Sequence, residues 1–127
     1  MGDIYVNDSG FGPAPVGADS AVMHMECAQA PEDVFAADDG YDAIFIDFGS
    51  AHDGRGFSQA RRPREMGYSG LIIARGAIIA DQYRHARQSG FDGVLLTKAQ
   101  ATRMPEPIWQ EQAQRVSTSY QERVFQR

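Results

Sequence analysis

The chain has 127 residues, 43% of them hydrophobic, which fits one domain with a buried core and argues against global disorder. No apolar run approaches the roughly 20 residues that cross a bilayer, and the start Met1-Gly2-Asp3 lacks the segments of a signal peptide. The single cysteine, Cys27, cannot form an internal disulfide, which favours a reducing compartment. We therefore expect a cytoplasmic, bacterial-type protein that does not interact with membranes.

The net charge of −5 is unevenly distributed along the chain. Residues 1–54 contain eleven acidic residues and no lysine or arginine, whereas residues 55–127 contain all twelve basic residues, eleven of them arginine, and six acidic ones. Such asymmetry can orient a charged partner or reflect complementary faces within the fold. A nucleic-acid binder is usually basic over a whole face, so we expect no nucleic-acid partner.

In chain order, the first short apolar run, residues 4–6, predicts a strand. The glycines and prolines of residues 7–19 predict a loop, and residues 21–25 predict a second strand. Pro31 is expected to open a short helix that ends at Gly40. Because no helical pattern separates the first two strands, their relative direction stays open.

The most continuous apolar run, residues 43–48, predicts a buried strand covered by helices on both sides. A helix over about residues 59–66 should follow, but Pro63 falls inside it. Either Ser58 caps this helix and the helix bends near Pro63, or the helix begins at Pro63 and the arginines lie on an extended turn. We favour the first alternative.

Further along the chain, strand and helix patterns continue to alternate. Residues 71–74 predict a strand that ends at Gly76, and residues 77–89 predict a helix that ends at Gly90. Residues 91–96 predict the next strand.

This alternation gives a βαβαβ core over residues 43–96. We therefore predict a single α/β domain with a mostly parallel sheet of four to five strands and helices on both faces. After Lys98, Pro105 and Pro107 flank the start of a short helix, and residues 116–120 form an extended tail. We expect four side chains of this helix to face the core: Ile108, Trp109, Gln112 and Ala113.

The turn after the central strand is the strongest candidate for an interaction site. Its two glycines allow close approach, its serine can cap a helix, and the free amides of that helix favour an anion. The candidate anion- or partner-binding residues are Asp53, Gly54, Arg55, Gly56, Ser58, Arg61 and Arg64. Possible polar supports are Asp47, Asp81, Gln82 and Asp92. The alternative is structural: the arginines pair with nearby carboxylates and the other polar residues fix the fold.

Several motifs together resemble a known family. They are Asp53-Gly54-Arg55-Gly56-Phe57-Ser58, Ala60-Arg61, Gly67-Tyr68-Ser69-Gly70, Asp81-Gln82, Ser89-Gly90-Phe91-Asp92, Met104-Pro105-Glu106-Pro107 with Trp109, and Ser119-Tyr120-Gln121. The chain resembles the bacterial domain of unknown function that is numbered nine hundred and thirty-four. The resemblance implies a family-like core over residues 43–121 after a variable acidic part, residues 1–42. The chain departs from the family pattern at two places. Arg62-Pro63 stands where a longer, apolar-backed helix is expected, and Ala77 stands where relatives often carry aspartate or histidine.

The resemblance also implies a biological setting. The family is often encoded beside assimilatory sulfite reductase, and its members are commonly labelled probable oxidoreductases, but no catalytic residues come with that label. The sequence has no Gly-x-Gly-x-x-Gly fingerprint, and one cysteine cannot hold an iron–sulfur cluster. His24, His52 and His85 lack zinc-site spacing, so we expect neither a cofactor nor a metal in this chain.

A looser likeness to receiver domains of response regulators gives another interpretation. Asn7-Asp8 would form the acidic pair, Asp47 would accept the phosphoryl group, and Lys98 would supply the lysine. The position of the receiver hydroxyl residue falls on Gly76, which has no hydroxyl.

Three functions therefore remain open. The favoured one is an accessory protein of sulfite assimilation, which binds an acidic partner such as sulfite reductase, or a small anion, through the arginine-rich turn. The alternatives are an enzyme, such as an oxidoreductase, that acts on an anionic substrate with a partner's cofactor, and a receiver-like phosphoacceptor. Ligands of parallel sheets gather beyond the carboxyl ends of the strands. We expect five residues to meet there: Asp47, Asp53, Arg55, Gly76 and Lys98.

Overall fold

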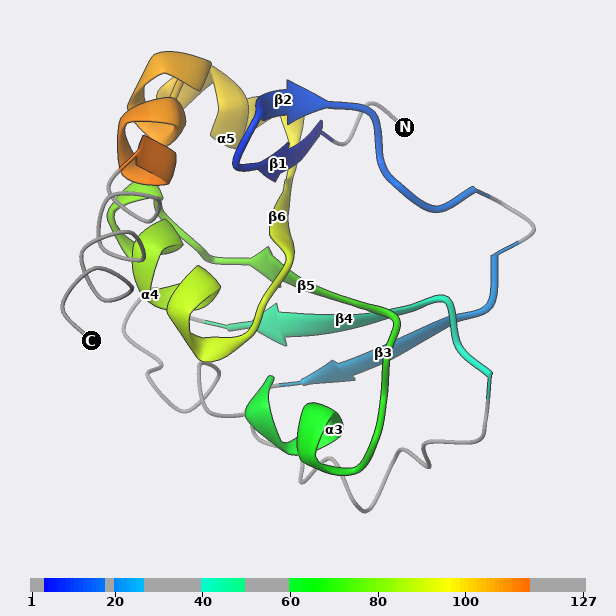
Figure 1. Ribbon diagram of the computed structural model, residues 1–127. Helices are drawn as coiled ribbons and strands as arrows, with labels where there is room; N and C mark the ends of the chain where they lie inside the picture. Colours follow the sequence, from blue (N-terminus) through cyan, green and yellow to red (C-terminus); the bar gives the residue numbers. More distant parts are fainter. Residues whose placement is uncertain (1–3, 18–19, 27–39, 50–59, 115–127) are drawn as a thin grey trace, which may run out of the picture.

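The computed structural model describes residues 4–17, 20–26, 40–49 and 60–114 (Figure 1). Its six strands are β1 (Ile4–Asn7), β2 (Gly10–Gly12), β3 (Val22–Glu26), β4 (Ala43–Phe48), β5 (Leu71–Gly76) and β6 (Gly93–Leu96). Its helical segments are α3 (Arg61–Glu65), the 3₁₀ turn η2 (Ala80–Gln82), α4 (Tyr83–Ser89), α5 (Lys98–Arg103) and a further helix over residues 106–114.

All six strands belong to one sheet in the order β2-β1-β6-β5-β4-β3. Strands β3 to β6 are parallel, whereas β1 runs antiparallel to both β6 and β2. The α/β class and the mostly parallel sheet are thus confirmed, with six strands among the described residues. Each parallel strand lies next to the strand that follows it in the sequence, and the following strand is always on the same side. Because crossovers are almost always right-handed, this order is consistent with α3 and α4, the described connecting helices, lying on one face.

The two faces of the sheet carry two separate apolar clusters. Tyr83 and Ala86 of α4, together with Trp109 of the last helix, pack into the larger cluster. The smaller cluster contains strand residues: Tyr5, Ala43, Phe45, Ile73 and Leu95. Helices on both faces were predicted, but among the described residues they pack against one face only, the face with the larger cluster. The strand order is consistent with this, because each successive parallel strand, from β3 to β6, is added on the same side of the one before it.

The expected loop over residues 7–19 is wrong at β2, which pairs with β1 as a hairpin. Gly10 has a φ of 109°, and a Cβ at this position would overlap the Glu106 carboxylate. The Phe11 amide donates to that carboxylate at 2.7 Å. Glycine thus permits a tight hairpin turn against the last helix, instead of preventing regular structure.

Two helix boundaries also differ from the prediction. Helix α3 begins at Arg61 and continues through Pro63, which lies in the first turn, where backbone amides have no intrahelical acceptor, so its missing N–H costs no hydrogen bond. The helix therefore neither starts nor needs to bend at this proline, and the expected cap at position 58 lies outside the described residues. The helix predicted over 77–89 begins only at η2: the Ala77 amide donates to the Phe48 carbonyl at 2.8 Å, and Ile79, directly before η2, is extended. Gly90, with a φ of 115°, ends α4 as predicted.

The C-terminal part contains one helix that was not predicted, α5, followed by the predicted one over residues 106–114. Trp109, Gln112 and Ala113 are buried as expected, but Ile108 is 42% exposed, so its inward placement is wrong. The indole of Trp109 donates to the Met104 carbonyl at 2.8 Å. The expected helix at residue 31 and the tail at residues 116–120 lie outside the described residues.

Candidate functional site

Arg64, a predicted anion-binding residue, holds the loop before β5 against the start of β6. Its Nη1 donates to the carbonyls of Tyr68 at 3.0 Å and Gly70 at 2.7 Å. Its Nη2 donates to Oδ2 of Asp92 at 2.8 Å, and the Ile72 amide donates to the same oxygen. Arg64 and Asp92 thus fix the amino ends of two strands, which agrees with the structural alternative for both.

Asp47, near the carboxyl end of β4, is held by the neighbouring residue of β5. Arg75 donates from Nε to Oδ1 at 2.6 Å and from Nη2 to Oδ2 at 3.0 Å. The guanidinium also lies over the Phe45 ring, 5.5 Å from its centroid. The two hydrogen bonds join one guanidinium to both oxygens of one carboxylate, a bidentate geometry that strengthens an ion pair. It matches the structural interpretation of Asp47, although the sequence did not identify Arg75 as the partner.

Asp8 is the centre of a third polar cluster. The Tyr83 hydroxyl donates to Asp8 at 2.5 Å, and Arg87 donates to both carboxylate oxygens, at 3.1 and 3.0 Å. Burial raises the pKa of Asp8, but hydrogen bonds from Arg87 and Tyr83 and the arginine charge outweigh it, so this pKa lies below its ordinary value. Burial, followed by the bond to Asp8, raises the pKa of Tyr83 and keeps its hydroxyl protonated.

The clusters around Asp8 and Asp47 lie at opposite ends of the sheet. Because β1 is antiparallel to β6, with Val6 opposite Val94, Asp8 lies towards the amino end of β6. Asp47 lies near the carboxyl end of β4. The receiver interpretation requires both carboxylates around one ion, and the structure does not bring them together. In the described ranges, no group of three or more His, Cys, Asp or Glu residues is placed to hold a metal.

The remaining predicted residues are scattered. Arg61 is exposed at the first position of α3, and Lys98 is exposed at the first position of α5. Asp81 is exposed on η2, where the side-chain Oε1 of Gln82 accepts from the Ile79 amide at 3.1 Å and fixes the turn. The rest of the arginine-rich turn lies outside the described residues: Asp53, Gly54, Arg55, Gly56 and Ser58.

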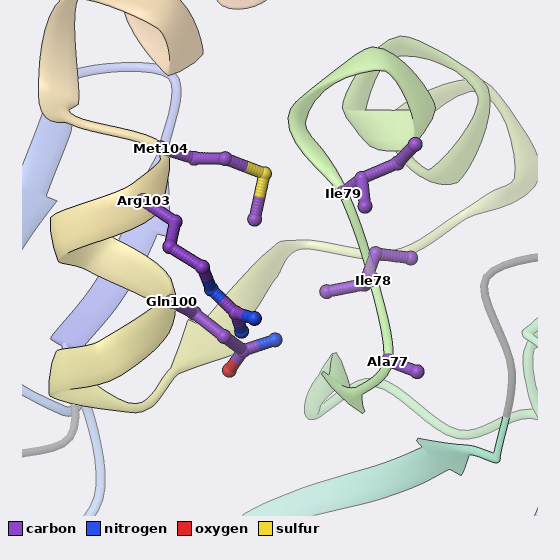
Figure 2. Close-up of a pocket in the computed structure, with 6 residues that line it drawn as sticks. All are labelled: Ala77, Ile78, Ile79, Gln100, Arg103 and Met104. Carbon is purple, nitrogen blue, oxygen red and sulfur yellow. The ribbon is translucent and has the colours of Figure 1, made fainter.

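A groove opens beyond the carboxyl end of β5, between the segment after that strand and α5 (Figure 2). It encloses about 350 Å³ and is lined by Ala77, Ile78, Ile79, Gln100, Arg103 and Met104. A second hollow of about 280 Å³ shares Gln100 and extends along the ends of β5 and β6. We call the first of these the carboxyl-edge groove. It lies at the end of the sheet where parallel α/β proteins place their ligands.

The charge in the carboxyl-edge groove comes from Arg103. Its side chain is exposed, and among the described residues it forms no ion pair. In Figure 2 its guanidinium lies beside the Gln100 amide and extends towards the segment of Ile78. Gln100 itself is occupied, since it donates to the Gly76 carbonyl at 2.6 Å and accepts from the Thr97 amide at 2.9 Å. Arg103 therefore has donors to spare for an anion.

The sequence-based prediction missed Arg103 because it missed the short helix α5. One signal was present: Thr97 and Gln100 have capping-box spacing, and their side chains do bond each other's amides. Even with that helix predicted, the opposite wall of the groove could not have been. That wall depends on a bend at Ala77 and an extended Ile79, where a helix was expected.

The comparison with protein families matches residues 22–127 to a family described as "Bacterial protein of unknown function (DUF934)". The chain belongs to this family. The match includes the whole carboxyl-edge groove and β3, whereas the hairpin of β1 and β2 precedes it. No curated protein and no solved structure matches the chain. Across the described residues of this family member, no helix is both long and apolar enough to cross a bilayer.

Proposed function

We propose that this member of the DUF934 family is a cytoplasmic accessory protein of sulfite assimilation, which binds an acidic partner or a small anion and does not itself catalyse a reaction. The observation that supports it is the guanidinium of Arg103 in the carboxyl-edge groove, which has no ion pair with any described residue. The proposed site differs from the arginine-rich turn favoured by the sequence, because Arg64 of that turn is engaged by Asp92. The residues of the turn outside the described ranges stay a prediction.

Binding is favoured over catalysis by the chemistry of the groove walls. Alanine, isoleucine, glutamine, arginine and methionine provide neither a nucleophile nor a general base. Three carboxylates elsewhere, Asp8, Asp47 and Asp92, are each paired with an arginine. A general base must reach the proton that it removes, and these carboxylates instead hold strands and helices together. The connection to sulfite assimilation comes from the family resemblance, and the positive groove is compatible with it.

Co-purification from the native host tests the proposal. A tagged chain is isolated from cells grown on sulfate, alongside Arg103→Met and a control, Arg84→Met, which removes an exposed arginine of α4 outside the groove. We expect sulfite reductase to accompany the wild type and the control, and the Arg103→Met variant to bind less of it. A strain without the gene should grow poorly on sulfite and normally on cysteine.

The oxidoreductase alternative gives a different result in the same experiment. A flavin or nicotinamide nucleotide that stays bound to the purified chain, with turnover of an anionic substrate, would replace the accessory function with an enzymatic one. Normal growth of the deletion strain on sulfite would remove the assignment to sulfite assimilation.

A further inference from the structure

We infer that the carboxyl-edge groove binds a small organic carboxylate with an apolar body of a few carbons, instead of an inorganic oxyanion. The inference rests on the proposed function only in placing the ligand in the same groove. It is drawn from three features of the walls: the engaged backbone amides, the apolar side chains and the single planar cation.

The backbone of the wall opposite α5 has few donors left. Sites for inorganic oxyanions usually combine several free backbone amides, as at helix N-termini and in nests. Here the amides of four consecutive residues already donate within the protein: Ala77 to the Phe48 carbonyl, Ile78 to the Gly76 carbonyl, Ile79 to the Gln82 side chain and Ala80 to the Met104 sulfur. A sulfate or sulfite ion would therefore rely on one arginine.

The side chains of the groove provide an apolar surface instead. Ile79 is 39% exposed and Met104 is partly exposed, so these two side chains provide most of the open apolar surface (Figure 2). Ile78 also lines the groove but is only 1% exposed. Methionine adapts its shape to a ligand because its side chain is unbranched and polarisable. Each methylene buried on such a surface strengthens binding by about fourfold. The volume of about 350 Å³ suits a small molecule.

The polar part of the ligand is defined by Arg103. Its planar guanidinium can donate two parallel hydrogen bonds to a carboxylate, which lysine cannot match. The neighbouring Gln100 side chain is held by the Gly76 carbonyl and the Thr97 amide, and it adds no further charge. An anionic head at Arg103 with a carbon chain along Met104 and Ile79 uses both parts of the groove.

Titrations of the ¹⁵N-labelled full chain followed by NMR test this inference, at constant ionic strength, with acetate, butanoate, hexanoate, hexan-1-ol, sulfate and sulfite. We expect the amides of residues 77–79 and 100–104 to shift with hexanoate. Affinity should increase by several-fold from acetate to butanoate and again to hexanoate. Hexan-1-ol, sulfate and sulfite should bind more weakly than hexanoate.

Two variants divide the site into its parts. Arg103→Met keeps an apolar stem and should weaken hexanoate about tenfold, with little effect on hexan-1-ol. Ile79→Ser should weaken hexanoate more than acetate. Both positions are partly or largely exposed, so both variants should fold, and Arg84→Met should bind as the wild type does.

Equal affinity for sulfate or sulfite and hexanoate at these amides would overturn the inference and leave the accessory function standing. Equal affinity for hexan-1-ol and hexanoate, or no shift of the groove amides, would also overturn it. Conversely, hexanoate binding in a chain whose deletion does not affect growth on sulfite would retain the inference and reject the proposed function.

Discussion

Three arginines of the described chain bind carboxylates that are distant in sequence. Arg64 and Arg75 each reach an aspartate 28 residues away, and Arg87 reaches Asp8 across 79 residues. Arg64 and Arg87 also donate to backbone carbonyls, which satisfies more of their donors. Arg61, Arg84 and Arg103 lack such a carboxylate among the described residues, and of these three only Arg103 lines the carboxyl-edge groove.

The Arg64→Ala variant is expected to lower the free energy of unfolding by about 1–3 kcal/mol, because two carbonyls and the Asp92 carboxylate lose a donor. The Arg64 side chain is one-third exposed, so water compensates for part of the loss. The control is Arg61→Ala, an exposed residue of the same helix, with an expected change within about 0.5 kcal/mol. Urea unfolding at neutral pH measures both. Equal effects would show that Arg64 does not act as a structural clamp.

Asp8 is expected to make the stability of the protein depend on pH. Its pKa is lower in the folded protein than its ordinary value of 3.8, so its stabilising contribution is complete above that value. The contribution is lost as the pH falls through the lower folded pKa. The wild type should therefore exceed Asp8→Asn in stability at pH 7, and the difference should shrink below about pH 4. A constant difference from pH 7 to pH 3 would contradict this prediction.

The sequence identified the charged residues of the candidate site but not their partners, because the ion pairs join residues that are distant along the chain. A turn rich in arginine and glycine is visible along the chain, but the partner of Arg64 lies beyond a further strand and helix. Asp47 was recognised as a polar strand end, yet its partner Arg75 could be identified only from the register of β4 and β5. The fold, and not the local sequence, therefore decides which arginines remain available to a ligand.

At the scale of elements, long apolar patterns were predictable and short elements were not. Strands β4 and β5 have nearly continuous apolar runs, which define them without tertiary information. Strand β2 has three residues and α5 has six, too few for a periodic signal. The groove wall at residues 77–79 also escaped prediction, because its conformation depends on hydrogen bonds to the carbonyls of Phe48 and Gly76 at the ends of β4 and β5.

Gly76 controls the position of that wall, and Gly76→Ala is expected to destabilise the protein by at least about 2 kcal/mol. Its φ of +95° is strained for other residues, and a Cβ would lie 2.5 Å from the Phe48 carbonyl oxygen. The control Gly49→Ala adds a methyl group in open space and should cost little. Thermal and urea unfolding compare the two. If both variants are equally stable, the bend after β5 does not require glycine.

At the scale of the whole molecule, the β1–β2 hairpin extends the parallel sheet beyond the part that matches the family. Val6 is fully buried in the larger core cluster, and β1 covers the edge of β6, whose four residues are all buried. Asp8 further joins the hairpin to α4. The hairpin therefore both completes the core and protects a strand edge.

Deletion of residues 1–12 is expected to lower the melting temperature and to promote association, because it exposes the apolar β6 as an edge strand. Val6→Ala is the matched variant: it creates a cavity and should lower stability while leaving the edge of β6 covered. Light scattering over a concentration series separates the effects, since association beyond the wild-type state is expected for the deletion and not for Val6→Ala. A deletion variant that melts and sediments like the wild type would mean that the parallel strands form a complete sheet without the hairpin.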